Sequence, residues 1–219
     1  MTSDGKGWTL IARFSNNDNK NWMRDDGYWW YDRIFVMRTA YSPSDNADMI
    51  SPAFWLVSGR EFKITRSDDP SHTTLLETRG NCLAGQTFRS KITSYGDFRN
   101  GKVWASDKCL GKCRIHLGGQ YWSTDGFQQT NCASMQGNWE IGFWCDWKDV
   151  GGSVMLIGGG GDCLTGADSG IGITESGEAS FIDDDHAGKA SDNIEYDFGY
   201  NAMRSSTPSQ SYSLNLWIR

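Results

Sequence analysis

The sequence predicts a single domain that is rich in strands and poor in helices. Strand patterns recur from the N-terminal region to the last residues, whereas helical periodicity is scarce. Aromatic residues run from Trp8 to Trp217, and no Pro/Ser-rich or Gly/Ser-rich linker interrupts the chain. Residues 1–219 are therefore expected to form one domain, which is long enough to bury about 70% of its unfolded surface.

Strand signals occur in four segments, and short helical turns are expected in two. The predicted strands are 8–13, 61–66, 153–157 and 211–218. The predicted helical turns are 84–95 and 124–133. Phe62 and Ile64 alternate with polar residues and are expected to point inward. Residues 158–210 are expected to be mostly irregular, and long irregular segments in compact domains are usually functional or held by an ion.

The C-terminal segment has the most regular alternation. One face carries Tyr212, Leu214, Leu216 and Ile218, and the other carries Ser211, Ser213, Asn215 and Trp217. This pattern predicts a half-buried strand.

Acidic residues are concentrated in one part of the chain. Residues 140–197 contain thirteen Asp and Glu against two Lys, a net charge of −11, whereas the remainder carries +5 and the whole chain −6. Compact folding brings these carboxylates together, and the repulsion needs relief from a cation or from solvent. Carboxylates interleaved with glycine carbonyls are ligands that Ca²⁺ takes, although no EF-hand loop is present. We expect calcium here; the alternative is an acidic surface that is simply solvated.

The candidate calcium ligands lie in two places. In the acidic segment they are Asp162, Asp168, Glu175 and Asp197, and near the N-terminus they are Asn16, Asn17 and Asp18. The candidate ligand-contacting residues are Asp162, Asp168, Glu175, Asp183 and His186. For the run 183–186 a solvated loop is the common alternative. The aromatic cluster at 22–31 is more often core packing than a ligand cage, but its rings could also stack on a sugar.

Six cysteines indicate disulfides in a secreted or surface domain. They are Cys82, Cys109, Cys113, Cys132, Cys145 and Cys163. Their spacings are not those of a zinc site, and six cysteines allow 15 connectivities, among which the sequence does not choose. Six buried free thiols are the alternative. Residues 1–8 show no signal peptide, so the chain is expected to be an excised domain with an added initiator Met.

Several function classes lack their signature motifs. There is no Gly-x-Ser-x-Gly elbow, no His-Glu-x-x-His and no phosphate-binding Gly-Lys-Ser/Thr, and His72 and His116 are expected to be structural. We therefore expect no enzymatic activity; an unrecognised hydrolase is the weakest alternative. The acidic pI, with no basic stripe in the sequence, argues against nucleic acid as a partner. No apolar stretch approaches the ~20 residues of a membrane span.

Short motifs in a fixed order resemble the fibrinogen-like domain family. They are Lys6-Gly-Trp-Thr-Leu-Ile11, Cys132-Ala-Ser-Met135, Ile157-Gly-Gly-Gly-Gly161, Tyr196-Asp-Phe198 and Leu216-Trp-Ile-Arg219. Their succession is similar to the intelectins (X-type lectins), and with Gly170-Ile-Gly-Ile-Thr-Glu175 it looks closest to fibrinogen-like domains of marine invertebrates, including coral skeletal matrix proteins. The resemblance spans nearly the whole chain.

The resemblance implies a mixed α+β domain: a small twisted β-sheet core with short helices and long irregular calcium-binding loops. It also implies a secreted, lectin-like protein with bound calcium, and it matches the structural calcium positions of intelectins to Asn16, Asn17, Asp18 and Asp197. The chain departs from the family at the sugar site. It has Gly152-Ser-Val-Met155 in place of the Asn, Glu and His ligands, and Met203 where a Tyr is expected.

Two functions are expected from these observations. The first is a secreted, calcium-dependent recognition module that binds glycans or microbial surface carbohydrate, as in innate immunity. The alternative is a non-catalytic extracellular or skeletal matrix domain with purely structural calcium. The sequence leaves the oligomeric state open, including a homo-oligomer.

Overall fold

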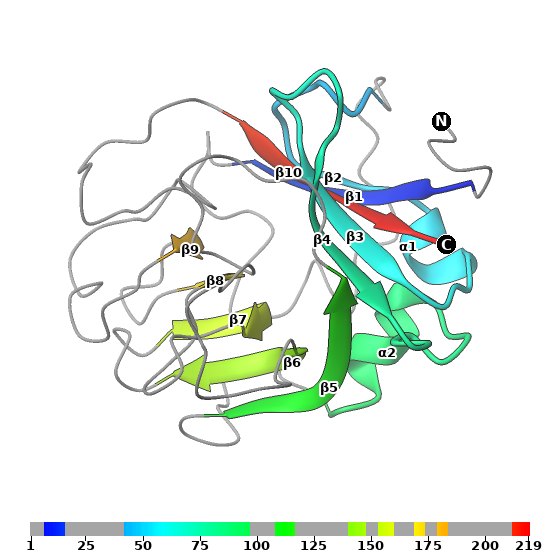
Figure 1. Cartoon of the computed structure of the whole chain (residues 1–219), viewed down its shortest axis with the longest axis vertical. Helices are drawn as coiled ribbons and strands as arrows, with labels where there is room; N and C mark the ends of the chain where they lie inside the picture. The colour runs from blue at the N-terminus through cyan, green and yellow to red at the C-terminus, as the bar shows by residue number, and fades with distance from the viewer. Residues whose placement is uncertain are drawn as a thin grey trace.

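A computed structural model of the chain describes residues 7–15, 42–96, 108–116, 140–147, 153–159, 169–173, 179–183 and 212–219. These residues form one ten-stranded antiparallel sheet that curls on itself, with two short helices (Figure 1). The strands are β1 (Thr9–Ser15), β2 (Met49–Ile50), β3 (Phe62–Arg66), β4 (Thr74–Arg79), β5 (Lys108–His116), β6 (Glu140–Trp147), β7 (Ser153–Gly159), β8 (Ser169–Ile173), β9 (Ala179–Asp183) and β10 (Ser213–Ile218). The helices are α1 (Ala53–Leu56) and α2 (Phe88–Thr93). The prediction of a strand-rich domain with few short helices is confirmed for this part of the chain.

The strand order is β2-β1-β10-β3-β4-β5-β6-β7-β8-β9. From β3 to β9 the strands follow one another as a meander, so each strand pairs with its neighbour in the sequence. The exception is β10, which inserts between β1 and β3 and joins the two ends of the chain. Leu216 pairs with Ala12 on one side and with Ile64 on the other.

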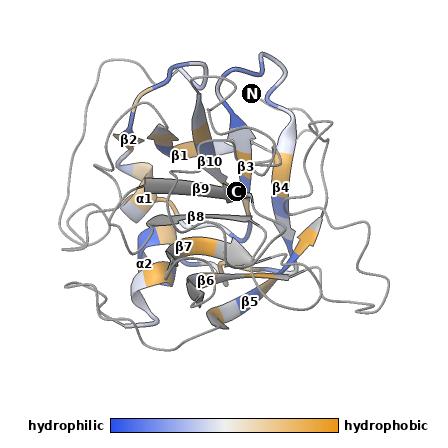
Figure 2. Ribbon diagram, turned by 90° about the vertical axis from the view of Figure 1, so that its left-hand side faces the viewer, coloured by the Kyte–Doolittle hydropathy of each residue, from blue (hydrophilic) through white to orange (hydrophobic). Residues whose placement is uncertain are grey.

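The core lies between the sheet and the two helices. Phe54 of α1, Phe88 of α2, Phe62 of β3 and Phe143 of β6 are fully buried. The ring of Phe88 packs against the other three, with ring centroids 5.3 Å from Phe54, 5.5 Å from Phe62 and 6.0 Å from Phe143. Such tilted and edge-on pairs add about 0.5–1.5 kcal/mol each beyond the burial of their area. Apolar residues also occur along β4, β5 and β7 (Figure 2).

The short helix α2 begins at a clear sequence signal. The backbone N–H of Ser90 donates to the side-chain oxygen of Thr87 at 3.0 Å, which caps the helix. Its apolar residues Phe88 and Ile92 point into the core. The helical turn expected within 84–95 is confirmed here, while the one expected at 124–133 lies outside the described residues.

One expectation about strands is wrong, and two are incomplete. β10 is buried on both faces and not on one, because Ser213 and Asn215 are covered as completely as Leu214. The segment 158–210, expected to be mostly irregular, contains the strands β8 and β9, and most of its other residues lie outside the described part. The strand expected at 153–157 forms but continues to Gly159, two residues into the glycine run. The strands expected at 8–13 and 61–66 are confirmed, with Phe62 and Ile64 fully buried.

Candidate functional site

The ends of five consecutive strands align at one end of the sheet. Register pairs join Arg114 to Glu140, Ile141 to Gly159, Gly159 to Ser169 and Ser169 to Asp183. We call this row, from β5 to β9, the loop end. The connections 117–139, 160–168 and 184–212 leave from it. The opposite end has the short connections 148–152 and 174–178, and the connection 80–107, which contains α2, enters β5 there. Long connections grouped on a rigid sheet are a common arrangement for binding sites.

The loop end receives most of the predicted ligands of the acidic segment. Asp183 is the last residue of β9, and Asp162 and Asp168 belong to the connection that joins Gly159 to its register partner Ser169. His186 and Asp197 belong to the connection that follows Asp183. Apart from the backbone of Asp183, these residues lie outside the described part, as does Glu175. The connection that contains Glu175 starts after Ile173, at the opposite end of β8 from Ser169.

The second predicted calcium turn begins directly after β1. Asn16, Asn17 and Asp18 lie outside the described residues. Ser15, which precedes them, is held in place by hydrogen bonds from both its backbone N–H and its hydroxyl group. Its backbone N–H donates to Oδ1 of Asp48 at 2.7 Å, and its hydroxyl donates to Oδ1 of Asn46 at 2.6 Å.

The sequence analysis did not single out Asp48 or Asn46. They stand in an ordinary polar stretch, and only the return of segment 42–48 onto β1 brings their oxygens to the start of the predicted turn. Asp48 is 8% exposed.

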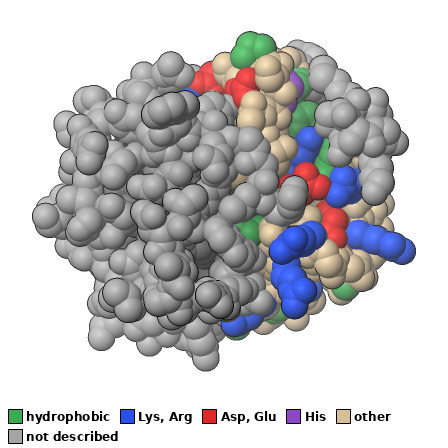
Figure 3. All heavy atoms as spheres, in the orientation of Figure 1, with side chains coloured by type: hydrophobic (Ala, Val, Ile, Leu, Met, Phe, Trp, Pro, Cys, Tyr) green, Lys and Arg blue, Asp and Glu red, His purple; other side chains and the backbone are tan. Residues whose placement is uncertain are grey.

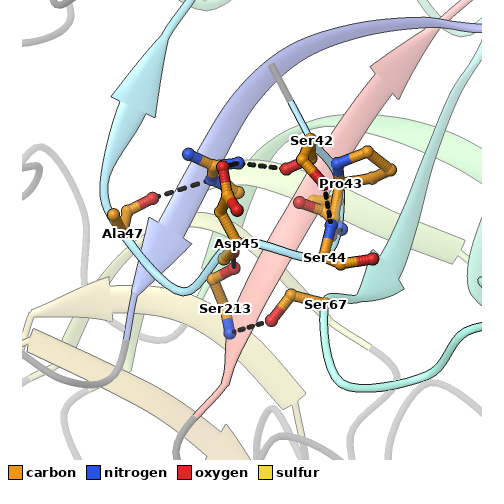
Figure 4. A network of polar contacts seen from close by, with 9 residues as sticks. Ser42, Pro43, Ser44, Asp45, Ala47, Ser67 and Ser213 are labelled. Carbon is orange, nitrogen blue, oxygen red and sulfur yellow. Dashed lines mark hydrogen bonds and ion pairs between the residues drawn. The ribbon is translucent and has the colours of Figure 1, made fainter. Parts of the chain in front are cut away.

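Segment 42–48 covers the polar face of β1 and β10 (Figure 4). The Arg13 guanidinium, 1% exposed, donates from Nε to the carbonyl oxygen of Ala47 at 2.8 Å and from Nη1 to that of Ser42. Burial lowers the pKa of Arg13 from its usual value, and the charge of Asp45 opposes that shift. Arginine remains charged under all ordinary conditions.

The neighbouring strand β10 binds the same segment. The amide of Asn215 donates to the carbonyl oxygen of Pro43 at 2.7 Å, and the hydroxyl of Ser213 donates to that of Asp45 at 2.9 Å. These contacts explain why the polar face of β10 is buried. The side chains of Arg13, Ser213 and Asn215 therefore have a structural role, because they donate their hydrogen bonds to backbone carbonyl groups of segment 42–48.

One disulfide is described. Cys82, which follows β4, is bonded to Cys113 of β5. Cys109 and Cys145 lie on β5 and β6 with side chains outside the described part, and Cys132 and Cys163 lie outside it altogether. Fixing the pair Cys82–Cys113 reduces the 15 connectivities to the three that four cysteines allow.

The described residues hold no cluster suited to metal binding. Among them there is no group of three or more His, Cys, Asp or Glu that could hold a metal ion. The ring of His72 lies 3.4 Å from the carbonyl oxygen of Arg66 through Nδ1 and 6.2 Å from the ring of Trp217, contacts typical of a structural histidine. In the same part of the chain, no helix has the length and apolar character needed to cross a membrane.

No protein-family model matches the chain, and the curated proteins compared with it include no match.

Proposed function

We propose that this chain is an extracellular, non-enzymatic recognition domain that binds glycans with the help of calcium at the loop end of the sheet. The supporting observation is topological: the connections 117–139, 160–168 and 184–212 leave the same end of strands β5 to β9. Together they contain eight Asp and Glu against two basic residues. An acidic set of loops on a rigid sheet suits a cation that binds in turn to hydroxyl-rich ligands.

The donor chemistry of these loops fits Ca²⁺. Carboxylates and free backbone carbonyls are hard oxygen ligands, and glycine-rich connections let them converge on one ion. We assign Asp162, Asp168 and Asp183 to this site, with His186 and Asp197 on the connection that follows. Glu175 belongs to the opposite end of β8, so in this proposal it does not share that ion.

A second, structural calcium is proposed at Asn16, Asn17 and Asp18. The hydrogen bonds from Ser15 to Asp48 and Asn46 support it, because they bring two further side-chain oxygens to the beginning of that turn. An ion there would bridge β1 and segment 42–48, which the same contacts already join.

The finer fold assignment, a fibrinogen-like or intelectin-like domain, is also a proposal. One support is the large sheet with few helices. The other is the pairing of β1 with β10, because these strands contain parts of the first and the last of the sequence motifs that resemble the family. The extracellular location is supported by the disulfide Cys82–Cys113, since such bonds persist in oxidising compartments.

A glycan array with and without chelator tests the proposal. We expect wild-type protein to bind a subset of glycans in calcium only, the D162N/D168N variant to lose those signals, and E175Q to keep them. The variants are compared after their melting curves show that they fold. Signals that persist in chelator, or equal losses for E175Q and D162N/D168N, would contradict the assignment. A complete absence of glycan signals would instead favour the matrix or assembly domain with structural calcium.

A further inference from the structure

Two arginines lie directly opposite each other on neighbouring strands. Arg79 of β4 and Arg114 of β5 are register partners, and both side chains are exposed. Lys112 precedes Arg114 by two residues and is exposed as well. We call Arg79, Lys112 and Arg114 the basic face. Figure 3 shows Lys and Arg side chains, with Asp and Glu side chains among them, on the described part of the surface.

The backbone of β5 directs these cations outward. Cys113 and Ile115 are 3% and 2% exposed and point into the core, so the alternate residues Lys112 and Arg114 point away from it. The register with β6 shifts between Leu110 and Cys113, where Gly111 has a φ of +66°. Such bulges change the direction of the side chains that follow.

The disulfide holds the basic face in place. Cys113 lies between Lys112 and Arg114, and its bond to Cys82 ties β5 to the chain just beyond Arg79. The disulfide therefore fixes the backbone positions from which the two arginine side chains extend, so a ligand orders the side chains alone.

The acids closest in sequence are already engaged. Glu77, two residues before Arg79, forms an ion pair with Arg219 at 2.6 Å. Glu61 accepts hydrogen bonds from the hydroxyl of Thr78 at 2.7 Å and from the backbone N–H of Asn81 at 2.6 Å.

The two arginines of the basic face form no ion pair within the described part of the chain. Glu140 of β6 is the register partner of Arg114 on its other side, and the side chain of Glu140 lies outside the described residues. Arg79 and Arg114 lie directly opposite each other, and like charges so placed destabilise a sheet, so an anion bound between them would offset this repulsion.

We propose that the basic face binds a linear anionic polysaccharide through its sulfate or carboxylate groups. Guanidinium groups bind such oxyanions in a bidentate manner. The Cβ atoms of directly opposite residues, such as Arg79 and Arg114, are about 5 Å apart across the strands, and residues two apart along a strand, such as Lys112 and Arg114, are separated by roughly 7 Å. An exposed sheet surface with this spacing suits an extended chain with repeated charges. The proposal does not depend on calcium.

Nucleic acid fits the same surface less well. Single strands are usually held by stacking of bases on exposed aromatic rings, and the exposed large hydrophobic residues of the described part are Leu56 and Val57. A net charge of −6 also repels a polyanion as densely charged as duplex DNA.

The test is binding to immobilised heparin at low salt, in calcium and in chelator. We expect wild-type protein to bind equally in both, to elute as salt rises, and to be displaced by dextran sulfate but not by neutral dextran. The variant R79Q/R114Q should bind about tenfold or more weakly. The variant R89Q/K91Q, with the same net charge, should bind within about twofold of wild type, because α2 covers the opposite, core side of the sheet.

Three outcomes would overturn the inference. They are no heparin binding by the wild-type protein, equal affinity of R79Q/R114Q and R89Q/K91Q, and displacement by duplex DNA as effective as that by dextran sulfate at equal charge. Melting curves check folding, and R79Q/R114Q should be no less stable than wild type because it removes a repulsion. A loss of heparin binding would leave the calcium-dependent glycan signals of the loop end unchanged, so the two proposals are tested independently.

Discussion

The Nε of Arg13 donates to the carbonyl oxygen of Ala47 at 2.8 Å from a guanidinium that is 1% exposed. Arg13 thus closes segment 42–48 over the polar face of the two strands that join the ends of the chain. The ion pair of the same guanidinium with Asp45 is longer, 3.5 Å, and Asp45 is 37% exposed. The backbone carbonyls therefore make the larger contribution to holding the segment.

Replacing Arg13 should separate these contributions. We expect R13M to destabilise the protein by about 3 kcal/mol, or roughly 6–12 °C in melting temperature, because buried carbonyl oxygens lose their donors. The matched variant D45N should cost at most about 1 kcal/mol, since a partly exposed ion pair contributes little. Thermal unfolding measures both, and equal losses would show that the ion pair is the dominant contact.

Gly111 should tolerate no side chain. Its φ is +66°, and a Cβ at this position would lie 2.1 Å from the hydroxyl oxygen of Tyr95. We expect G111A to cost about 2 kcal/mol or more, from left-handed strain and from displacement of the Tyr95 ring. The control is G85A, where φ is +75° but no atom lies within 4 Å of the added Cβ. If both variants lose the same stability, the contact with Tyr95 is unimportant.

Removing the disulfide should destabilise the protein substantially. Cys82 and Cys113 are separated by 31 positions, and closing a loop of this size restricts the unfolded chain by about 3.5 kcal/mol. We expect C82A/C113A to unfold at lower denaturant concentration. Its heparin affinity should also fall relative to wild type at a temperature where both are folded, because Arg79 and Arg114 are then less firmly placed. Unchanged stability would mean that the bond adds nothing to packing already present.

Calcium should raise the melting temperature. An ion that binds the folded state alone adds about 2.7 kcal/mol at a hundredfold excess over Kd. We expect a clear upward shift in calcium over chelator, and slower proteolysis within 158–198. In D162N/D168N the shift should shrink, and in E175Q it should stay. Identical curves in calcium and chelator would argue against every calcium position proposed here, and would favour a solvated acidic face.

Hydrophobic patterns within the sequence correctly predicted two of the strands. The alternation of Phe62 and Ile64 gave β3, and the apolar run before the glycines gave β7. The strand β8 was missed because Ser169-Gly-Ile-Gly-Ile173 is rich in glycine, which weakens a strand and reads as loop. β8 forms because it pairs with β7 and β9, and this pairing cannot be read from the sequence of β8 alone.

Long-range contacts decided the rest. Asn215 and Ser213 looked like a solvent-facing row, but segment 42–48, about 170 positions away, covers them. Likewise, the sequence shows no basic stripe, because Arg79 and Arg114 become neighbours only when β4 pairs with β5.

The sequence by itself determined the strand-rich class, the alternation of β10 and the concentration of carboxylates in the last third of the chain. Those properties follow from side-chain period and composition, which act between near neighbours. Only the tertiary structure decided that both faces of β10 are buried, which cysteine pairs with Cys82, and which strand ends share one edge. The reason is that pairing register joins residues far apart in the chain, and a local pattern carries no information about its partner.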